Sequence, residues 1–144
     1  MGGICAIHGP NVEQLAKRIC SRLRHQGSNN EELFIKGNVA LGHSPLQTDG
    51  VPVLHQPITN EDKTIWITFD GEIYNKQQLI EQLEKTHSFE TNCSAETTVH
   101  AYEETGPNCA NRLNGAFAFA LWDSTKAKLF SATDRFGMKP LYYC

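Results

Sequence analysis

The chain has 144 residues, of which 40% are apolar and 20% charged, so it is long enough to bury the core of one domain. Its net charge of −3 gives no basic surface for nucleic acid. The longest apolar run, residues 116–122, is far too short to cross a bilayer, and no signal peptide precedes it. We therefore expect a single cytoplasmic domain, residues 1–144, with neither a nucleic-acid partner nor a membrane anchor.

Short apolar runs and helical periodicities alternate along the chain. Residues 3–8 form an apolar run typical of a strand, and Val12, Leu15, Ile19 and Leu23 then recur at helical spacing. Strands are predicted at 33–36 and 39–42, followed by a turn-rich loop at 44–60 and a buried strand at 64–69 that ends in a turn at 70–71. Two helices follow at 76–85 and 94–105, and residues 116–122 and 128–132 form a hairpin. This mixture predicts an α+β layered domain.

Several segments, in order, match motifs of a known family. Residues 69–75 read FDGEIYN, residues 113–120 read LNGAFAFA, and residues 134–143 read DRFGMKPLYY; NVALGH at 38–43 and HAYEE at 100–104 lie between or beside them. The chain resembles, almost from end to end, the class II glutamine amidotransferase domain of asparagine synthetases. The resemblance implies an Ntn-hydrolase-like four-layer αββα sandwich with two antiparallel sheets. It also implies that the C-terminal strands of the domain are truncated here.

The resemblance locates the nucleophile at residue 2. Members of the family use an N-terminal cysteine whose thiolate attacks the glutamine amide, while its own α-amino group acts as base. Here residue 2 is Gly2, which supplies an amine but no nucleophile. Cys5 is the fallback, because residues 5–9 loosely match the opening pattern of active members. Residues 2–9 align without a gap to the opening segment of the family, which puts residue 2 at the nucleophile position. This favours the alternative that Cys5 is a buried core residue.

Other positions that match the family's glutamine pocket are also altered. Pro45 occupies the place of an arginine that binds the substrate carboxylate, and Ser94 that of an aspartate that binds the substrate ammonium. We expect Ser94 to cap the following helix instead. In the oxyanion hole Gly71 is kept, but an asparagine has become Asp70, and an ionised carboxylate cannot donate a hydrogen bond. The family's HRGPD segment reads HQGSN at residues 25–29.

These changes predict a catalytically inactive domain that does not bind glutamine and serves in binding or regulation. Two alternatives are a glutamine hydrolase that uses Cys5 or acts as a fragment of a larger ligase, and a purely structural module. The chain contains no GxxxxGKS/T loop for ATP, and its six histidines show no metal-ligand spacing, so no cofactor and no metal are expected. The five cysteines are odd in number and scattered, which favours reduced thiols. A synthetase domain, another protein or a second copy of the chain is the expected partner.

Overall fold

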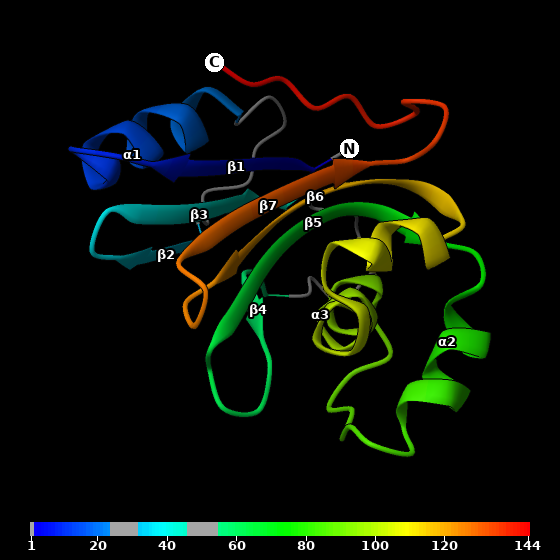
Figure 1. Ribbon diagram of the computed structural model, residues 1–144. Coiled ribbons are helices and arrows are strands. Elements are labelled where there is room, and N and C mark those ends of the chain that lie inside the picture. The colour runs from blue at the N-terminus through cyan, green and yellow to red at the C-terminus, as the bar shows by residue number, and fades with distance from the viewer. Residues whose placement is uncertain (1, 24–31, 46–54) are drawn as a thin grey trace.

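The computed structural model describes residues 2–23, 32–45 and 55–144. These form two antiparallel sheets and three α-helices (Figure 1). The first sheet has the order β1-β3-β2, built from β1 (Gly3–His8), β2 (Glu32–Lys36) and β3 (Val39–Ser44). The second has the order β4-β5-β6-β7, built from β4 (Ile58–Thr59), β5 (Ile65–Ile73), β6 (Gly115–Asp123) and β7 (Lys128–Thr133). The helices are α1 (Val12–Leu23), α2 (Lys76–Leu83) and α3 (Ser94–Thr105), with a 3-10 helix at Gly106–Arg112.

The two sheets lie face to face, and helices cover their outer faces (Figure 1). Side chains of β3 and β6 meet between the sheets, where Leu41 and Trp122 belong to one buried cluster. On the opposite face of the first sheet, Ala40 packs against Val12 and Ala16 of α1. Helix α3 lies against the outer face of the second sheet, and α2 packs on α3 (Figure 1). The predicted αββα order of layers is therefore confirmed.

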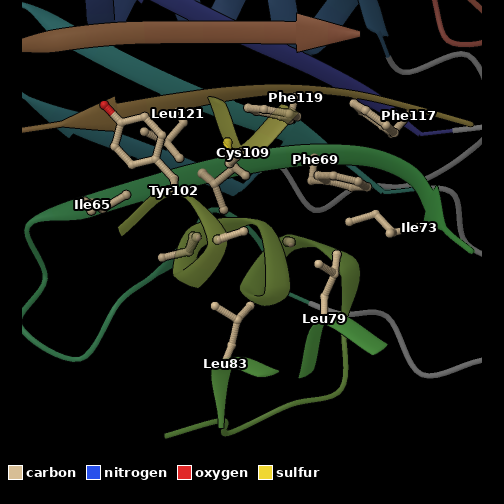
Figure 2. Close-up of a cluster of buried hydrophobic side chains, with 14 residues drawn as sticks. Ile65, Phe69, Ile73, Leu79, Leu83, Tyr102, Cys109, Phe117, Phe119 and Leu121 are labelled. Atoms are coloured by element: carbon tan, nitrogen blue, oxygen red, sulfur yellow. The ribbon is translucent and has the colours of Figure 1, made fainter. Parts of the chain in front are cut away.

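The largest core lies between the second sheet and the helices α2 and α3 (Figure 2). Phe69 of β5 stacks on Phe117 and Phe119 of β6, with ring centroids about 6 Å apart (6.0 and 6.1 Å). Leu79 and Leu83 approach this layer from α2. Aromatic rings bury the largest areas per side chain, so this layer contributes strongly to the stability of the domain.

Helix α1 buries a different face from the one predicted. Its buried residues are Val12, Ala16 and Cys20, whereas Leu15 and Ile19 are 39% and 38% exposed. The prediction was wrong for Leu15 and Ile19, whereas Val12 is buried and Leu23 is half-buried. Small side chains at positions 16 and 20 allow the helix to approach the sheet closely. The boundaries of β1 and α3 and the buried face of α2 are as predicted.

Strand β5 continues through the position where a turn was predicted. It runs from Ile65 to Ile73 and pairs with β6 along its whole length, including Asp70 with Ala118 and Gly71 with Phe117. Gly71 has a φ of +121°, a backbone conformation that glycine tolerates and other residues rarely adopt. The glycine therefore distorts the strand locally without ending it.

The predicted loop at 44–60 contains the end of β3 and the short strand β4, and residues 46–54 of it lie outside the described residues. Residues 134–144 form no helix or strand. The turn that opens this segment is held by the Asp134 carboxylate, which accepts hydrogen bonds from the backbone N–H groups of Phe117, Phe136, Met138 and Lys139. Burial acts to raise the pKa of Asp134, but these donors outweigh it and hold the pKa below its usual value.

Within the described ranges, no helix is both long and apolar enough to cross a membrane.

Candidate active site

Residue 2 lies directly before β1, on the side that faces the second sheet. Alternate residues of β1 point to opposite faces: Ala6 packs between the sheets, whereas Ile7 packs with the residues of α1. A Cβ atom built on Gly2 would lie 3.5 Å from Asp70 Oδ1, 3.5 Å from His43 Nε2 and 3.2 Å from the carbonyl oxygen of Ser44. The fold thus brings together two of the predicted site positions, Gly2 and Asp70, which are far apart in the sequence.

Asp70 forms an ion pair with Lys139. The sequence did not predict Lys139 as a site residue. Lys139 Nζ lies 2.9 Å from Asp70 Oδ2, and the two side chains are only 17% and 20% exposed. The lysine comes from the DRFGMKP segment, which was interpreted as framework. Only the path of the chain after β7 brings this segment to Asp70, so no spacing in the sequence indicates the pair.

His43 is the second titratable group beside residue 2. It lies on β3 and is 7% exposed, with its Nδ1 atom 3.7 Å from Glu32 Oε2. Burial lowers the pKa of His43, and the nearby carboxylates of Glu32 and Asp70 oppose this shift without reversing it. The imidazole is therefore neutral at physiological pH. NVALGH at 38–43 was used as a family motif, but His43 itself was not predicted as a site residue.

Gly71, the predicted oxyanion position, is required by strand pairing. A Cβ atom at residue 71 would lie 2.0 Å from the carbonyl oxygen of Ala116 and 2.8 Å from the Cα atom of Phe117. Real Cβ atoms essentially never approach other heavy atoms so closely. The close pairing of β5 with β6 explains glycine here whether or not its N–H group has a chemical role.

Ser94 does not cap α3, contrary to the prediction. The N-cap residue is Cys93, whose sulfur accepts a hydrogen bond from the N–H group of Glu96. Ser94 is the first helical residue, and its Oγ atom accepts a hydrogen bond from the backbone N–H of Ile73 at 3.1 Å. The prediction was wrong because Ser94 is 5% exposed and faces the end of β5, where the buried backbone N–H of Ile73 needs an acceptor. Ser94 therefore joins α3 to the strand that carries Asp70.

Pro45 is buried and directly follows Ser44, whose carbonyl oxygen faces residue 2. It has no charge and no backbone donor. The segment at residues 25–29, which matches HRGPD of the family, lies outside the described residues.

Cys5, the fallback nucleophile, lies on the α1 side of β1. Its Sγ atom is 3.4 Å from Cys20 Sγ of α1, and both side chains are buried. Added atoms at Gly42, which pairs with Cys5, would collide with both sulfurs. Because residues 2 and 5 differ by an odd number of positions, their side chains point to opposite faces of the strand.

Comparison with known proteins agrees with this architecture. The family described as "Glutamine amidotransferase domain" matches residues 1–144. The chain belongs to the glutamine amidotransferase domain family. It is 37% identical to asparagine synthetase (glutamine-hydrolyzing) 1 of Bacillus subtilis over 132 residues, which cover 91% of this chain and 21% of that protein. It is 38% identical to asparagine synthetase (glutamine-hydrolyzing) of Zea mays over 147 aligned positions, which cover 99% of this chain and 25% of that protein.

Two solved structures resemble the domain. The allosteric regulatory enzyme of purine biosynthesis superposes with a TM-score of 0.59 at 26% identity, covering 72% of this chain and 25% of that chain. Glutamine phosphoribosylpyrophosphate amidotransferase of B. subtilis superposes with a TM-score of 0.54 at 25% identity, covering 69% of this chain and 24% of that chain. This amidotransferase domain spans about a quarter of the length of the relatives that it matches.

Proposed function

We propose that this asparagine synthetase-like amidotransferase domain is catalytically inactive as a glutaminase and does not bind glutamine. The observation that carries the proposal is the absence of any side chain at Gly2, the position that faces Asp70 and His43. A glutaminase of this class needs a thiol there, beside a neutral amine. The α-amino group of Gly2 would have no nucleophile to activate.

The surroundings of residue 2 support the same conclusion. Acyl transfer from glutamine places negative charge on the amide oxygen in the transition state, and an active site must aim hydrogen-bond donors at that oxygen. Asp70 presents a carboxylate oxygen 3.5 Å from where a Cβ of residue 2 would lie. Lys139 offsets the charge of Asp70, but it is paired with this carboxylate at 2.9 Å and is not aimed at the amide oxygen of a substrate.

Cys5 is a poor substitute for the missing thiol. Its sulfur lies beside Cys20 under α1, on the face of β1 opposite to Asp70 and His43. A thiol that acts as a nucleophile needs access to substrate, and a thiol buried between a strand and a helix lacks that access. We infer that Cys5 is part of the core.

The test is ammonia release from glutamine by a series of variants, with removal of Met1 checked by mass spectrometry. We expect no ammonia from the natural sequence or from Gly2→Cys alone. The quadruple variant Gly2→Cys, Asp70→Asn, Pro45→Arg and Ser94→Asp should recover measurable turnover. Reverting position 70 to Asp in that variant should cost a factor of about 100 to 1,000, because one oxyanion donor contributes about 3 kcal/mol.

Two outcomes would contradict this proposal. Ammonia release by the natural sequence that disappears in Cys5→Ala would move the catalytic centre to Cys5. Activity of the single Gly2→Cys protein would mean that the pocket is intact and that only the nucleophile is missing. Calorimetric titration with glutamine gives an independent measurement, and we expect no binding heat at millimolar glutamine.

We further propose that the domain acts through a synthetase domain or another protein partner. Its relatives are much longer chains, of which it spans about a quarter. Large apolar side chains after β7 are highly exposed: Phe136 at 86%, Met138 at 67%, Tyr142 at 90% and Tyr143 at 97%. Contiguous exposed apolar side chains are typical of interaction sites. Sedimentation at micromolar concentration tests the simplest partner, a second copy, and Tyr142→Ser with Tyr143→Ser should weaken any dimer that forms.

A further inference from the structure

Four side chains from three separate segments gather beside α3, away from the residues that surround Gly2. Glu61 lies in the turn between β4 and β5, His87 follows α2, and His100 and Glu103 lie one turn apart on α3. One possible ligand atom from each side chain lies within 4.8 Å of all the others. Because these residues come from three segments, the histidine spacing in the sequence gave no sign of the group.

We propose that Glu61, His87, His100 and Glu103 form a structural zinc site that joins the β4–β5 turn, the segment after α2 and helix α3. Two imidazole nitrogens and two carboxylate oxygens are ligands that Zn²⁺ accepts. Imidazole ligands disfavour Mg²⁺ and Ca²⁺, which bind almost entirely through oxygen. Four protein ligands complete a tetrahedron and leave no open position for water, so the site is structural and not catalytic.

The distances between the ligand atoms fit a tetrahedral ion. His100 Nδ1 lies 2.8 Å from Glu103 Oε2 and 4.0 Å from Glu61 Oε2, and His87 Nδ1 lies 3.4 Å from Glu103 Oε2. Ligands around an ion with bonds of about 2.0 Å are separated by about 3.3 Å. These three separations differ from that value by less than about 1 Å, so small side-chain shifts would bring these ligands to tetrahedral positions.

Neighbouring groups already hold the ligands in the required orientation. Asn60 donates a hydrogen bond to Glu103 Oε1 at 2.7 Å, and the backbone N–H of Ser88 donates to Glu61 Oε1 at 3.1 Å. In both carboxylates the second oxygen, Oε2, is left for the cluster. The ring nitrogen Nε2 of His87 lies 2.9 Å from Glu104 Oε1, the carboxylate–histidine arrangement common at metal sites.

Packing and charge favour a cation here. The His100 ring is 1% exposed, stacked on His87 and in edge contact with Phe89, with both ring-centroid distances 4.7 Å. A histidine must be neutral to bind a metal ion, and with both imidazoles neutral the two carboxylates leave a charge of −2, which one divalent ion would neutralise. Glu61 has a side chain that is 48% exposed, so the site is open to an incoming ion on that side.

The test is zinc binding by the full 144-residue chain after treatment with a chelator. Competition with a chromogenic zinc indicator gives affinity and stoichiometry, and we expect one Zn²⁺ per chain. His87→Gln should weaken binding by more than about 100-fold, and Glu104→Ala by about 10- to 100-fold, as for loss of a group that orients a ligand. His8→Gln, a histidine change on β1 outside the cluster, should leave affinity unchanged.

Two further measurements keep the test decisive. Cobalt substituted for zinc should show the visible absorption of a tetrahedral ion without a thiolate charge-transfer band. Circular dichroism of the metal-free variants checks that they are folded. If His87→Gln is unfolded, Glu61→Gln on the exposed turn replaces it, and we expect this variant to lose more than about 10-fold in zinc affinity. Absence of saturable binding would overturn the proposal. So would stoichiometric binding that survives in the folded variants, or a loss of binding as large in His8→Gln.

Discussion

Gly71 offers the sharpest test of how the fold constrains the residues around position 2. In the family resemblance this glycine supplies an oxyanion donor, whereas in the structure it permits the close pairing of β5 with β6. Changing Gly71 to alanine leaves its N–H group in place and adds only a methyl group. The substitution therefore tests why the fold needs glycine at residue 71, separately from any role of its N–H group.

The expected loss of stability has two sources. An alanine at a φ of +121° is strained by about 1–3 kcal/mol. Its Cβ atom would also lie 2.0 Å from the Ala116 carbonyl oxygen, so the two strands must separate, and overpacking of this kind costs about 1–3 kcal/mol or more. The sum, about 2–6 kcal/mol, is a large part of the stability of about 5–15 kcal/mol that domains possess.

Urea unfolding followed by tryptophan fluorescence measures the effect. With a slope of about 2 kcal/mol/M, a loss of about 4 kcal/mol lowers the midpoint by about 2 M. The matched control is Gly37→Ala in the β2–β3 turn, where φ is +59° and no atom lies within 4 Å of an added Cβ. That control should cost only the strain, about 1–2 kcal/mol. If Gly71→Ala is no less stable than Gly37→Ala, the argument from strand pairing is wrong.

Two further predictions concern the Asn75 side chain and the buried His43. The Asn75 side chain donates a hydrogen bond to the Arg112 carbonyl oxygen at 2.9 Å and accepts one from the Asn114 N–H at 3.0 Å. Asn75→Ala should therefore lower the free energy of unfolding by about 1–3 kcal/mol, and an unchanged urea midpoint would contradict this. Burial lowers the pKa of His43, so an NMR titration should place its midpoint below 6.5. Because the unfolded state binds this proton more readily, the stability contributed by neutral His43 is present above pH 6.5 and is lost as the pH falls towards the folded-state pKa. The Asp70 carboxylate opposes the shift, so Asp70→Asn should lower the midpoint further, and a rise would contradict the assigned cause.

The amino-acid sequence alone was sufficient to predict the family and most element boundaries, and the αββα layers followed from the resemblance to that family. The element boundaries depend on local signals: the alternation of β1, the periodicity of α2 and the end of α3 at Gly106 all act over a few residues. Motifs such as LNGAFAFA carry the resemblance because they are contiguous. The same local reasoning failed at α1, where packing distance selected Ala16 and Cys20 over the larger Leu15 and Ile19.

Tertiary structure alone decided which distant residues meet. The Lys139–Asp70 pair depends on the path of the chain after β7, and the hydrogen bond from Ile73 to Ser94 depends on how α3 docks on β5. The opposite facing of Gly2 and Cys5 follows from strand alternation, but which face is the site depends on where α1 packs. Long-range contacts of this kind are set by the packing of whole layers against one another, so the spacing of residues along the chain does not predict them.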